Sequence, residues 1–280
     1  MLEVIEETIA RLPVLPLRPY IERYIGYRFE GFPAGTHRGL PSRHLTFIIS
    51  LQDQIDVVAV PGATEPPGSF TGVISGFYPG SAIIRHNGTQ VGVCAELSPL
   101  GARALLGLPA GALASSIAEP RDVVGRSAVD LPDRLASAPS WSSRFDLLDE
   151  ILVGWLREGR NPRPEIAYAW RRLLDTGGAV SVQELARETG WSRRHLSERF
   201  RSEVGLSPKL AARIVRFDRA RLLLERSTRP ALSEVAVLCG FFDQAHLTRD
   251  FNDFAGCSPT VWMAEEIPSV QDKLASVAAE

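Results

Sequence analysis

The sequence predicts an α+β protein: a small antiparallel β-barrel with trailing helices, then an all-α domain of two helix-turn-helix units joined by a long helix. Two observations predict this fold class. Short runs of β-branched and apolar residues fill residues 20–97, whereas helical periodicity dominates from residue 98 onwards. In addition, residues 166–264 contain two similar copies of one pattern, which indicates two copies of one structural unit.

Length and composition restrict the class of protein. The 280 residues suit two domains of ordinary size, and the hydrophobic fraction of 45% is normal for a globular chain. No apolar run approaches the ~18 residues of a membrane helix, and the acidic N-terminus lacks the features of a secretory signal. Cys94, Cys239 and Cys257 form neither a CxxC pair nor a disulfide framework. We therefore expect a cytoplasmic protein.

Charge is distributed unevenly along the chain, whose formal net charge is −2. Residues 1–165 carry a net charge of −3, and the tail from residue 265 carries −3. Residues 166–264 carry 15 basic and 11 acidic side chains, a net charge of +4, and arginine dominates the basic set. If the chain binds nucleic acid, this segment is expected to meet the phosphate backbone.

The predicted strands lie close together. They cover Arg43–Leu51, Asp56–Val60, Ser69–Tyr78, Ala82–His86 and Thr89–Ala95. Between the last two, Asn87-Gly88 suits the positive φ angles of a type I′ hairpin turn. Short, closely spaced strands of this kind are typical of an antiparallel sandwich or a small barrel.

Helices are predicted to follow the strands. Ser98-Pro99 suits a helix start, and Gly107 suits the end of that helix. A longer helix is predicted over Ser142–Glu158, with a stripe that either packs on the barrel as a lid or forms a dimer contact. The stripe comprises Phe145, Leu148, Leu152, Trp155 and Leu156.

The run Gly159–Pro164 holds two prolines and a glycine and cannot continue that helix. We therefore predict domains at 1–160 and 166–264, a linker at 161–165 and a tail at 265–280.

The repeat is the strongest signal in the chain. Its first copy comprises Glu184–Gly190, Leu196–Phe200 and Gly205–Pro208. Its second copy comprises Glu234–Gly240, Leu247–Phe251 and Gly256–Pro259, with one extra residue between Gly240 and Leu247. Each copy is predicted to form a helix, a short turn and a second helix.

Local chemistry supports this interpretation of the repeat. Ser181 and Ser233 are the predicted N-caps of the first helices. Gly190 and Gly240 can adopt the left-handed conformation that ends a helix. The small Ala186 and Ala236 allow a close helix crossing. Leucine and phenylalanine four residues apart form the inner seam of each second helix. These seams are Leu196 with Phe200 and Leu247 with Phe251.

The second helices present polar side chains outward. In the first unit they include Arg193, Arg194, Ser197, Glu198 and Arg201. In the second unit they include Asp243, Gln244, His246, Thr248, Arg249 and Asn252. Arginine can pair with guanine or neutralise phosphate, glutamate can accept from cytosine, and glutamine and asparagine suit adenine. Two matched polar faces favour DNA reading over a merely solvated surface. We take all of these as candidate DNA-binding residues except Asp243.

A long helix is predicted between the units, over Pro208–Glu225. Its ~18 residues span roughly 27 Å at ~1.5 Å per residue. This length is close to the ~34 Å between successive major-groove faces on one side of DNA. One chain could therefore place both second helices in adjacent grooves.

Residues 166–264 resemble the DNA-binding domain of the AraC/XylS family of transcription regulators. The resemblance rests on Gly240–Phe251 (GFFDQAHLTRDF) and the following Gly256–Pro259 (GCSP), and it extends over about a third of the chain. It implies double-stranded DNA and RNA polymerase as partners, and two helix-turn-helix units joined by a long helix. It also implies base reading from Arg193, Arg194, Ser197, Glu198, Gln244, His246 and Thr248. Ala245 departs from the family pattern, because a polar residue is common there.

For residues 1–160 the resemblance is to the family's cupin-like sensory and dimerising domains, through Val91–Gly107. It implies a small-molecule effector or a homodimer. Candidate pocket residues are Phe47, Phe77, Tyr78 and Arg85, because barrel mouths can hold small ligands.

The histidines and cysteines of the chain do not favour a metal site or an enzyme. His37, His44 and His86 form no HxH pair and have no glutamate at ligand spacing, so we predict no metal and no cofactor. The alternative functions are a DNA-binding enzyme of the alkyl-repair type and a regulator whose first domain only dimerises. No cysteine has a flanking Pro-Cys-His pattern, and no GxSxG, Walker or GxGxxG motif occurs. We therefore predict that the chain is not an enzyme.

Overall fold

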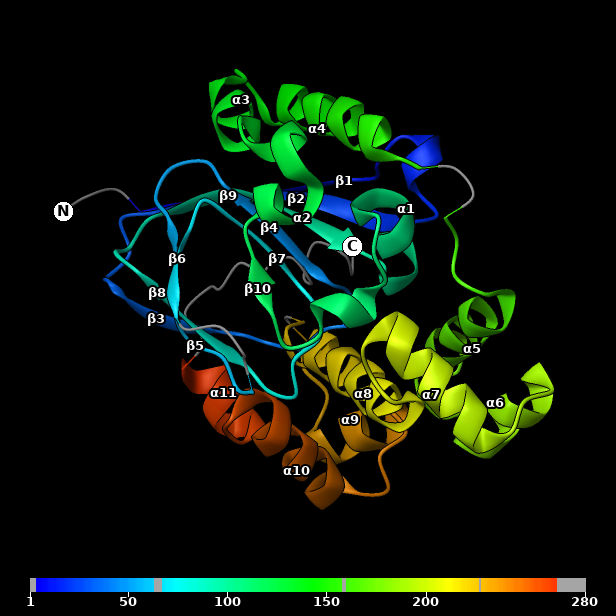
Figure 1. Cartoon of the computed structure of the whole chain (residues 1–280). Coiled ribbons are helices and arrows are strands. Elements are labelled where there is room, and N and C mark those ends of the chain that lie inside the picture. Colours follow the sequence, from blue (N-terminus) through cyan, green and yellow to red (C-terminus); the bar gives the residue numbers. More distant parts are fainter. Residues whose placement is uncertain (1–3, 63–66, 158–159, 227, 266–280) are drawn as a thin grey trace.

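The computed structural model describes residues 4–62, 67–157, 160–226 and 228–265, and it has the predicted α+β architecture (Figure 1). An antiparallel β domain with its own helices precedes a helical domain. In Figure 1 the helices α5 to α11 lie together on one side of the β domain.

Ten strands form two antiparallel sheets in the described part of the chain. The six-stranded sheet has the order β1 (Ile5–Arg11), β2 (Ile21–Glu30), β9 (Gln90–Leu97), β4 (Thr46–Ser50), β7 (Gly72–Ser75) and β10 (Ile117–Ala118). The four-stranded sheet has the order β3 (Gly35–Gly39), β8 (Ala82–His86), β5 (Ile55–Ala59) and β6 (Gly68–Phe70). No strand pairing joins the two sheets into a closed barrel among these residues. The first strand, β1, was not predicted.

The turn at Asn87-Gly88 differs from its prediction. It connects β8 to β9, but these strands belong to different sheets, so no hairpin forms. Gly88 has a φ of +101°, whereas Asn87 is not among the residues with positive φ, which excludes a type I′ turn. The Asn87 side chain instead donates to Asp53 over 3.1 Å and accepts from the backbone of Thr89 over 3.0 Å. The backbone N–H of Phe32 donates to the Gly88 carbonyl over 3.2 Å, which ties this corner to the loop after β2.

Helices and short 3-10 turns accompany the strands of the first domain. They are η1 (Leu15–Leu17), η2 (Pro99–Gly101), α1 (Ala102–Leu106), η3 (Ala110–Leu113), α2 (Pro120–Val124), η4 (Gly125–Ala128), α3 (Leu131–Ser137) and α4 (Trp141–Trp155). As predicted, Ser98 caps the first of the helices after β9, and Gly107 ends α1 in the left-handed conformation. Figure 1 shows α3 and α4 lying over the sheet.

The apolar stripe of α4 packs on this sheet. The Phe145 ring stacks 5.9 Å from Tyr24 of β2, and the Trp155 ring stacks 6.0 Å from Phe47 of β4. Leu148 and Leu152 are fully buried between the same layers. Of the two interpretations of the stripe, the structure therefore supports the lid, because the face that a dimer would need is covered by the chain itself.

Seven helices form the second domain in the described residues. They are α5 (Pro164–Asp175), α6 (Val182–Thr189), α7 (Arg193–Val204), α8 (Pro208–Leu224), α9 (Leu232–Leu238), α10 (Gln244–Ala255) and α11 (Pro259–Glu265). Because α5 begins at Pro164, the last two residues of the predicted linker are helical. The predicted tail lies outside the described residues except for Glu265, which ends α11.

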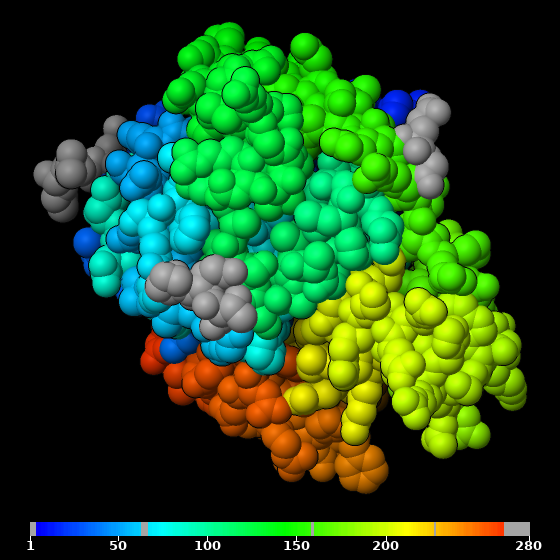
Figure 2. All heavy atoms as spheres, viewed as in Figure 1, coloured from blue at the N-terminus to red at the C-terminus, as the bar shows by residue number. Residues whose placement is uncertain are grey.

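The two domains share one continuous hydrophobic core. The Trp170 ring of α5 lies 6.1 Å from Phe77, which follows β7, and 6.3 Å from Phe200 of α7. Arg103 of α1 forms an ion pair with Glu203 of α7, and Arg43 reaches Asp218 of α8 over 3.4 Å. Figure 2 shows the yellow and orange helices pressed against the blue-to-green domain.

Candidate nucleic-acid interface

In the first repeat unit the turn signals act as predicted. Ser181 caps α6 in a capping box: its hydroxyl accepts from the backbone N–H of Glu184, and the Glu184 carboxylate accepts from that of Ser181. Gly190 ends α6 with a φ of +71°. Ser192 then caps α7 by accepting from the backbone of His195 over 3.2 Å. The second helix is therefore fixed in direction by local hydrogen bonds.

The second unit has the same frame with a different first cap. The N-cap of α9 is Ala231, whose side chain cannot accept a hydrogen bond, and the predicted cap Ser233 lies inside the helix. Within the repeat Ala231 is the counterpart of Ser181, because each stands three residues before the shared glutamate. Gly240 follows the end of this helix with a φ of +73°, and Asp243 caps α10 by accepting from the His246 backbone over 2.7 Å.

The residues of the inner seams are buried in both units. Leu196, Phe200, Leu247 and Phe251 are all fully buried, and Ala186 and Ala236 are buried where the first helices cross. The polar residues between these positions are consequently turned away from the core.

On α7 the predicted residues form one solvent-facing surface. Arg193, Arg194, Glu198 and Arg201 are exposed, and Ser197 is half-buried. The Arg194 Nε atom donates to the Glu198 Oε1 atom over 2.8 Å. This hydrogen bond and the positive charge of Arg194 lower the pKa of Glu198. Arg199 is also exposed on this helix, although it was not predicted as a binding residue.

On α10 the predicted residues are not equivalent. Gln244, Arg249 and Asn252 are exposed, and together with Ala245 and Thr248 they line a shallow surface hollow. His246 is half-buried: its Nδ1 atom accepts from the Phe242 backbone over 3.4 Å, and its ring meets the edge of Phe241 at 5.3 Å. The imidazole is thus partly occupied in holding the turn.

Internal ion pairs and hydrogen bonds engage several of the arginines of α8. Arg213 pairs with Asp250 over 2.8 Å and with Asp253 over 2.5 Å. Arg216 donates to the Gly178 carbonyl over 2.7 Å, and burial lowers its pKa. These arginines hold α8 against its neighbours, whereas the arginines of α7 and Arg249 of α10 face solvent.

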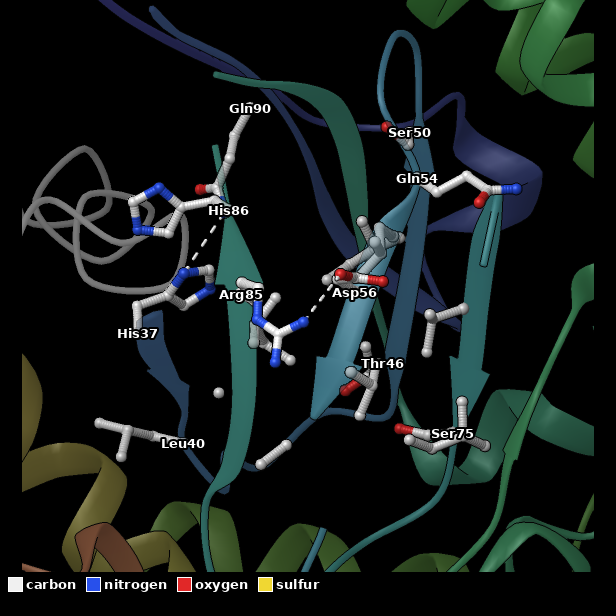
Figure 3. A pocket seen from close by; sticks show the side chains of 18 of the residues that line it. His37, Leu40, Thr46, Ser50, Gln54, Asp56, Ser75, Arg85, His86 and Gln90 are labelled. Carbon is white, nitrogen blue, oxygen red and sulfur yellow. Dashed lines mark hydrogen bonds and ion pairs between the residues drawn. The ribbon is translucent and has the colours of Figure 1, made fainter. Parts of the chain in front are cut away.

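A cavity of about 570 Å³ lies between the two sheets of the first domain (Figure 3). Phe77, Tyr78 and Arg85 line it, whereas Phe47 faces the opposite side of its sheet and packs on α4. Figure 3 shows that polar side chains come from both sheets, among them Thr46, Ser50, Ser75, His37, His86 and Gln90. The walls combine apolar and hydrogen-bonding groups, as small-molecule sites do.

All three histidines of the strand region line the cavity. The rings of His37 and His86 lie 5.7 Å apart. His44 contacts Glu22 over 2.8 Å and Glu96 over 3.8 Å, and ligand atoms of these three side chains lie within 4.8 Å of one another. Sequence spacing missed this cluster, because its members come from three separate segments.

Arginines already occupy the carboxylates of this cluster. Arg43 pairs with Glu22 over 2.6 Å, and Arg23 pairs with Glu96 over 2.8 Å. Burial by itself would raise the pKa of Glu22, but His44 and Arg43 lower it well below its usual range. A metal ion would have to displace these cations, so the donor set fits an ion-pair network better than a metal site.

Two of the three cysteines, Cys94 and Cys239, lack an activating environment. Cys94 and Cys239 are buried, which raises the pKa of both thiols, that of Cys239 to about 11. Both side chains remain protonated at neutral pH, whereas a nucleophilic cysteine must be a thiolate. This environment does not favour the alkyl-accepting alternative.

The helical domain matches known proteins. Residues 185–265 match a family described as a helix-turn-helix domain. The uncharacterized HTH-type transcriptional regulator YbfI of Bacillus subtilis is 35% identical over 68 residues, 24% of either chain. The probable transcriptional regulator LumQ of Photobacterium leiognathi is 33% identical over 81 residues, 29% of this chain and 32% of LumQ. The chain thus spans only about a quarter to a third of the length of these relatives.

Structural similarity extends over both domains. Apo ToxT K231A of Vibrio cholerae has a TM-score of 0.55 at 9% identity, over 86% of this chain and 97% of that structure. This likeness concerns the fold alone. No helix in the described ranges combines the length and the hydropathy needed to cross a membrane.

Proposed function

We propose that the chain is a sequence-specific DNA-binding transcription regulator of the AraC type, because residues 185–265 match a helix-turn-helix domain family. One observation carries the proposal: α7 and α10 expose equivalent polar faces on either side of α8. The 17 residues of α8 span about 26 Å, which suits two helices in adjacent major grooves. Such a regulator would work in the cytoplasm, because it must reach chromosomal DNA. RNA polymerase would be a further partner.

The two reading helices would have different tasks. On α7, Arg193, Arg194 and Arg201 are placed to pair with guanine edges or to neutralise phosphates. On α10, Gln244 and Asn252 suit adenine, and these residues flank a surface hollow rather than a charged ridge. The first unit would therefore supply more of the electrostatic attraction.

Selection of bound DNA from a random pool tests this function. The full chain should enrich one sequence with two parts about one helical turn apart, and its affinity should fall steeply with salt because phosphate contacts release counterions. A chain that enriches no sequence, or whose binding does not depend on salt, would refute the proposal.

We also propose that a small molecule in the first domain controls DNA binding. The cavity between the sheets supports this, and a structure of ToxT, which shares the fold, holds an unsaturated fatty acid. The loop between β7 and β8 lines this cavity, contacts the second unit directly and reaches the first unit through Trp170 of α5. Phe77 of the loop meets Trp170, which packs on Phe200 of α7, and the Ser81 hydroxyl donates to the Ala255 carbonyl at the end of α10 over 3.5 Å. A ligand that displaces this loop would therefore shift both helices.

Thermal shift with a metabolite panel tests this second proposal. A true effector must raise the melting temperature by mass action and must also change the affinity for the selected DNA. A chain that responds to no compound but forms a stable dimer would favour the alternative of a first domain that only dimerises.

A further inference from the structure

The turn of the second helix-turn-helix unit is one residue longer than that of the first. The structure identifies the additional residue as Phe242. The aromatic residue after the glycine is equivalent in both units: Trp191 meets the edge of His195 at 4.6 Å, and Phe241 meets His246 at 5.3 Å. The N-caps are equivalent as well, because Ser192 and Asp243 each accept from the backbone of that histidine. Phe242 stands between Phe241 and Asp243 and has no counterpart in the first unit.

Phe242 has no packing role inside the domain. Its side chain is 92% exposed, the highest value among the large hydrophobic side chains of the described residues. Phe241, by contrast, is 5% exposed and packs in the hydrophobic core of the domain. The backbone N–H of Phe242 holds the His246 ring, but that contact does not depend on the side chain. A phenyl ring left in water forgoes the burial that normally stabilises it, so this side chain is available to a partner outside the domain.

The position of Phe242 indicates which partner. It immediately precedes Asp243, the N-cap of α10, and a recognition helix meets base edges with its N-terminal residues. Gln244 and Ala245, the next exposed residues, line the surface hollow on the reading face. Phe242 therefore lies next in sequence to the residues whose polar surface the proposed function assigns to DNA. In the major groove the main apolar group is the C5-methyl of thymine.

We propose that Phe242 is a specificity residue that packs against a thymine methyl group in the half-site of the second unit. This inference rests on the proposed DNA-binding function. It predicts that the second unit prefers thymine at one position near the start of α10, and that the first unit lacks an equivalent preference. Val237, which is 75% exposed on α9, lies in the first helix of the unit rather than in its reading helix and serves as a matched control.

The test replaces each thymine of the selected operator in turn by deoxyuridine, which lacks only the methyl group. We expect the wild-type chain to bind roughly three- to tenfold more weakly at one position of the second half-site, the range for losing one buried methyl contact. Phe242→Ala should bind the unmodified operator more weakly by a similar factor and should no longer distinguish thymine from deoxyuridine there. Val237→Ala should keep the wild-type pattern. Unchanged melting temperatures would show that both variants fold.

Two results would overturn the inference alone. In the first, Phe242→Ala keeps both the affinity and the thymine dependence of the wild type. In the second, Phe242→Ala and Val237→Ala impair transcription equally without changing DNA affinity, which would make this surface a contact for another protein. A wild-type chain that selects no DNA sequence would instead refute the proposed function, and this inference with it.

Discussion

At the scale of single residues, the pair Arg194–Glu198 shows how the outer surface of α7 is arranged. Both side chains are largely exposed, at 89% and 60%, and the glutamate holds the guanidinium in place over 2.8 Å. An exposed pair of this kind adds little to stability. It does, however, keep both groups at the outer surface of the helix, where the arginine can exchange its partner for a guanine edge or a phosphate.

Replacing Arg194 by alanine should weaken binding to the selected operator by about 1–3 kcal/mol, as expected when an arginine that contacts a base is lost. Fluorescence anisotropy titrations of wild type and variant measure this difference. Arg187→Ala is the matched control. Arg187 is exposed on α6, so this substitution removes the same charge outside the reading helix. Equal affinity for wild type and Arg194→Ala would mean that the first unit docks without reading bases.

Residue patterns predicted the candidate interface better than they predicted the cavity. The seam leucines and phenylalanines mark α7 and α10 because i and i+4 positions share a helix face. The His44–Glu22–Glu96 cluster gave no such signal, since its members are distant in sequence and meet only through strand pairing. Phe47 was proposed for the pocket from its residue type alone, and the alternation of β4 turns it toward α4 instead.

At the scale of elements, α6 and α9 are equivalent in sequence but are capped differently. The capping box of α6 satisfies two backbone donors, whereas Ala231 leaves the first turn of α9 without a side-chain acceptor. The backbone of Ala231 nevertheless has the extended conformation of an N-cap, with φ −61° and ψ 148°. Glu234 stands where Glu184 completes the box in the first unit.

Ala231→Ser should therefore stabilise the chain, and Ser181→Ala should destabilise it, each by about 0.5–2 kcal/mol. Serine at 231 would supply the missing acceptor and allow a second capping box with Glu234. Shifts of melting temperature relative to wild type measure both effects. Ser233→Ala is the control and should change little, because Ser233 lies inside α9 and caps nothing. A larger loss from Ser233→Ala than gain from Ala231→Ser would contradict the cap assignment.

Helices with strong local periodicity were predicted well, but strand partners were not. The predicted long helix is found as α8, because proline after a serine cap and regular apolar spacing are local features. The Asn87-Gly88 turn gave an equally clear local signal, yet the chain uses it to pass from one sheet to the other. Which strand a segment pairs with depends on packing across the whole domain, and turn chemistry alone cannot specify it.

At the scale of the whole molecule, the first domain holds the C-terminal ends of both reading helices. Gly111 of η3 lies against the end of α7, where a Cβ atom would approach the Ser202 carbonyl oxygen to 2.3 Å. The loop before β8 contacts Asp253 and Ala255 near the end of α10. The N-terminal halves of both helices, which carry Arg194 and Gln244, remain exposed. The first domain can thus orient α7 and α10 without covering the faces that are proposed to read DNA.

The ion pair between Arg103 and Glu203 is the clearest test of this arrangement, because it joins α1 of the first domain to α7. The guanidinium donates twice, over 2.5 and 2.9 Å, to a carboxylate that is 12% exposed. Arg103→Ala leaves that carboxylate without either donor and should destabilise the chain by roughly 1–3 kcal/mol. Calorimetry should show one transition in the wild type, because the core is continuous, and a lower or divided transition in the variant.

A double-mutant cycle separates the pair from its surroundings. If the contact couples the domains, Arg103→Ala combined with Glu203→Ala should cost less than the sum of the two single changes, by about 0.5–3 kcal/mol. Arg121→Ala provides the control, since Arg121 is an exposed arginine whose nearest carboxylate, that of Asp122, is 4.0 Å away. Additive effects of the two changes would mean that shared apolar packing alone holds α7 against the first domain, and an effector would then have to act through the loop at Phe77 rather than through this ion pair.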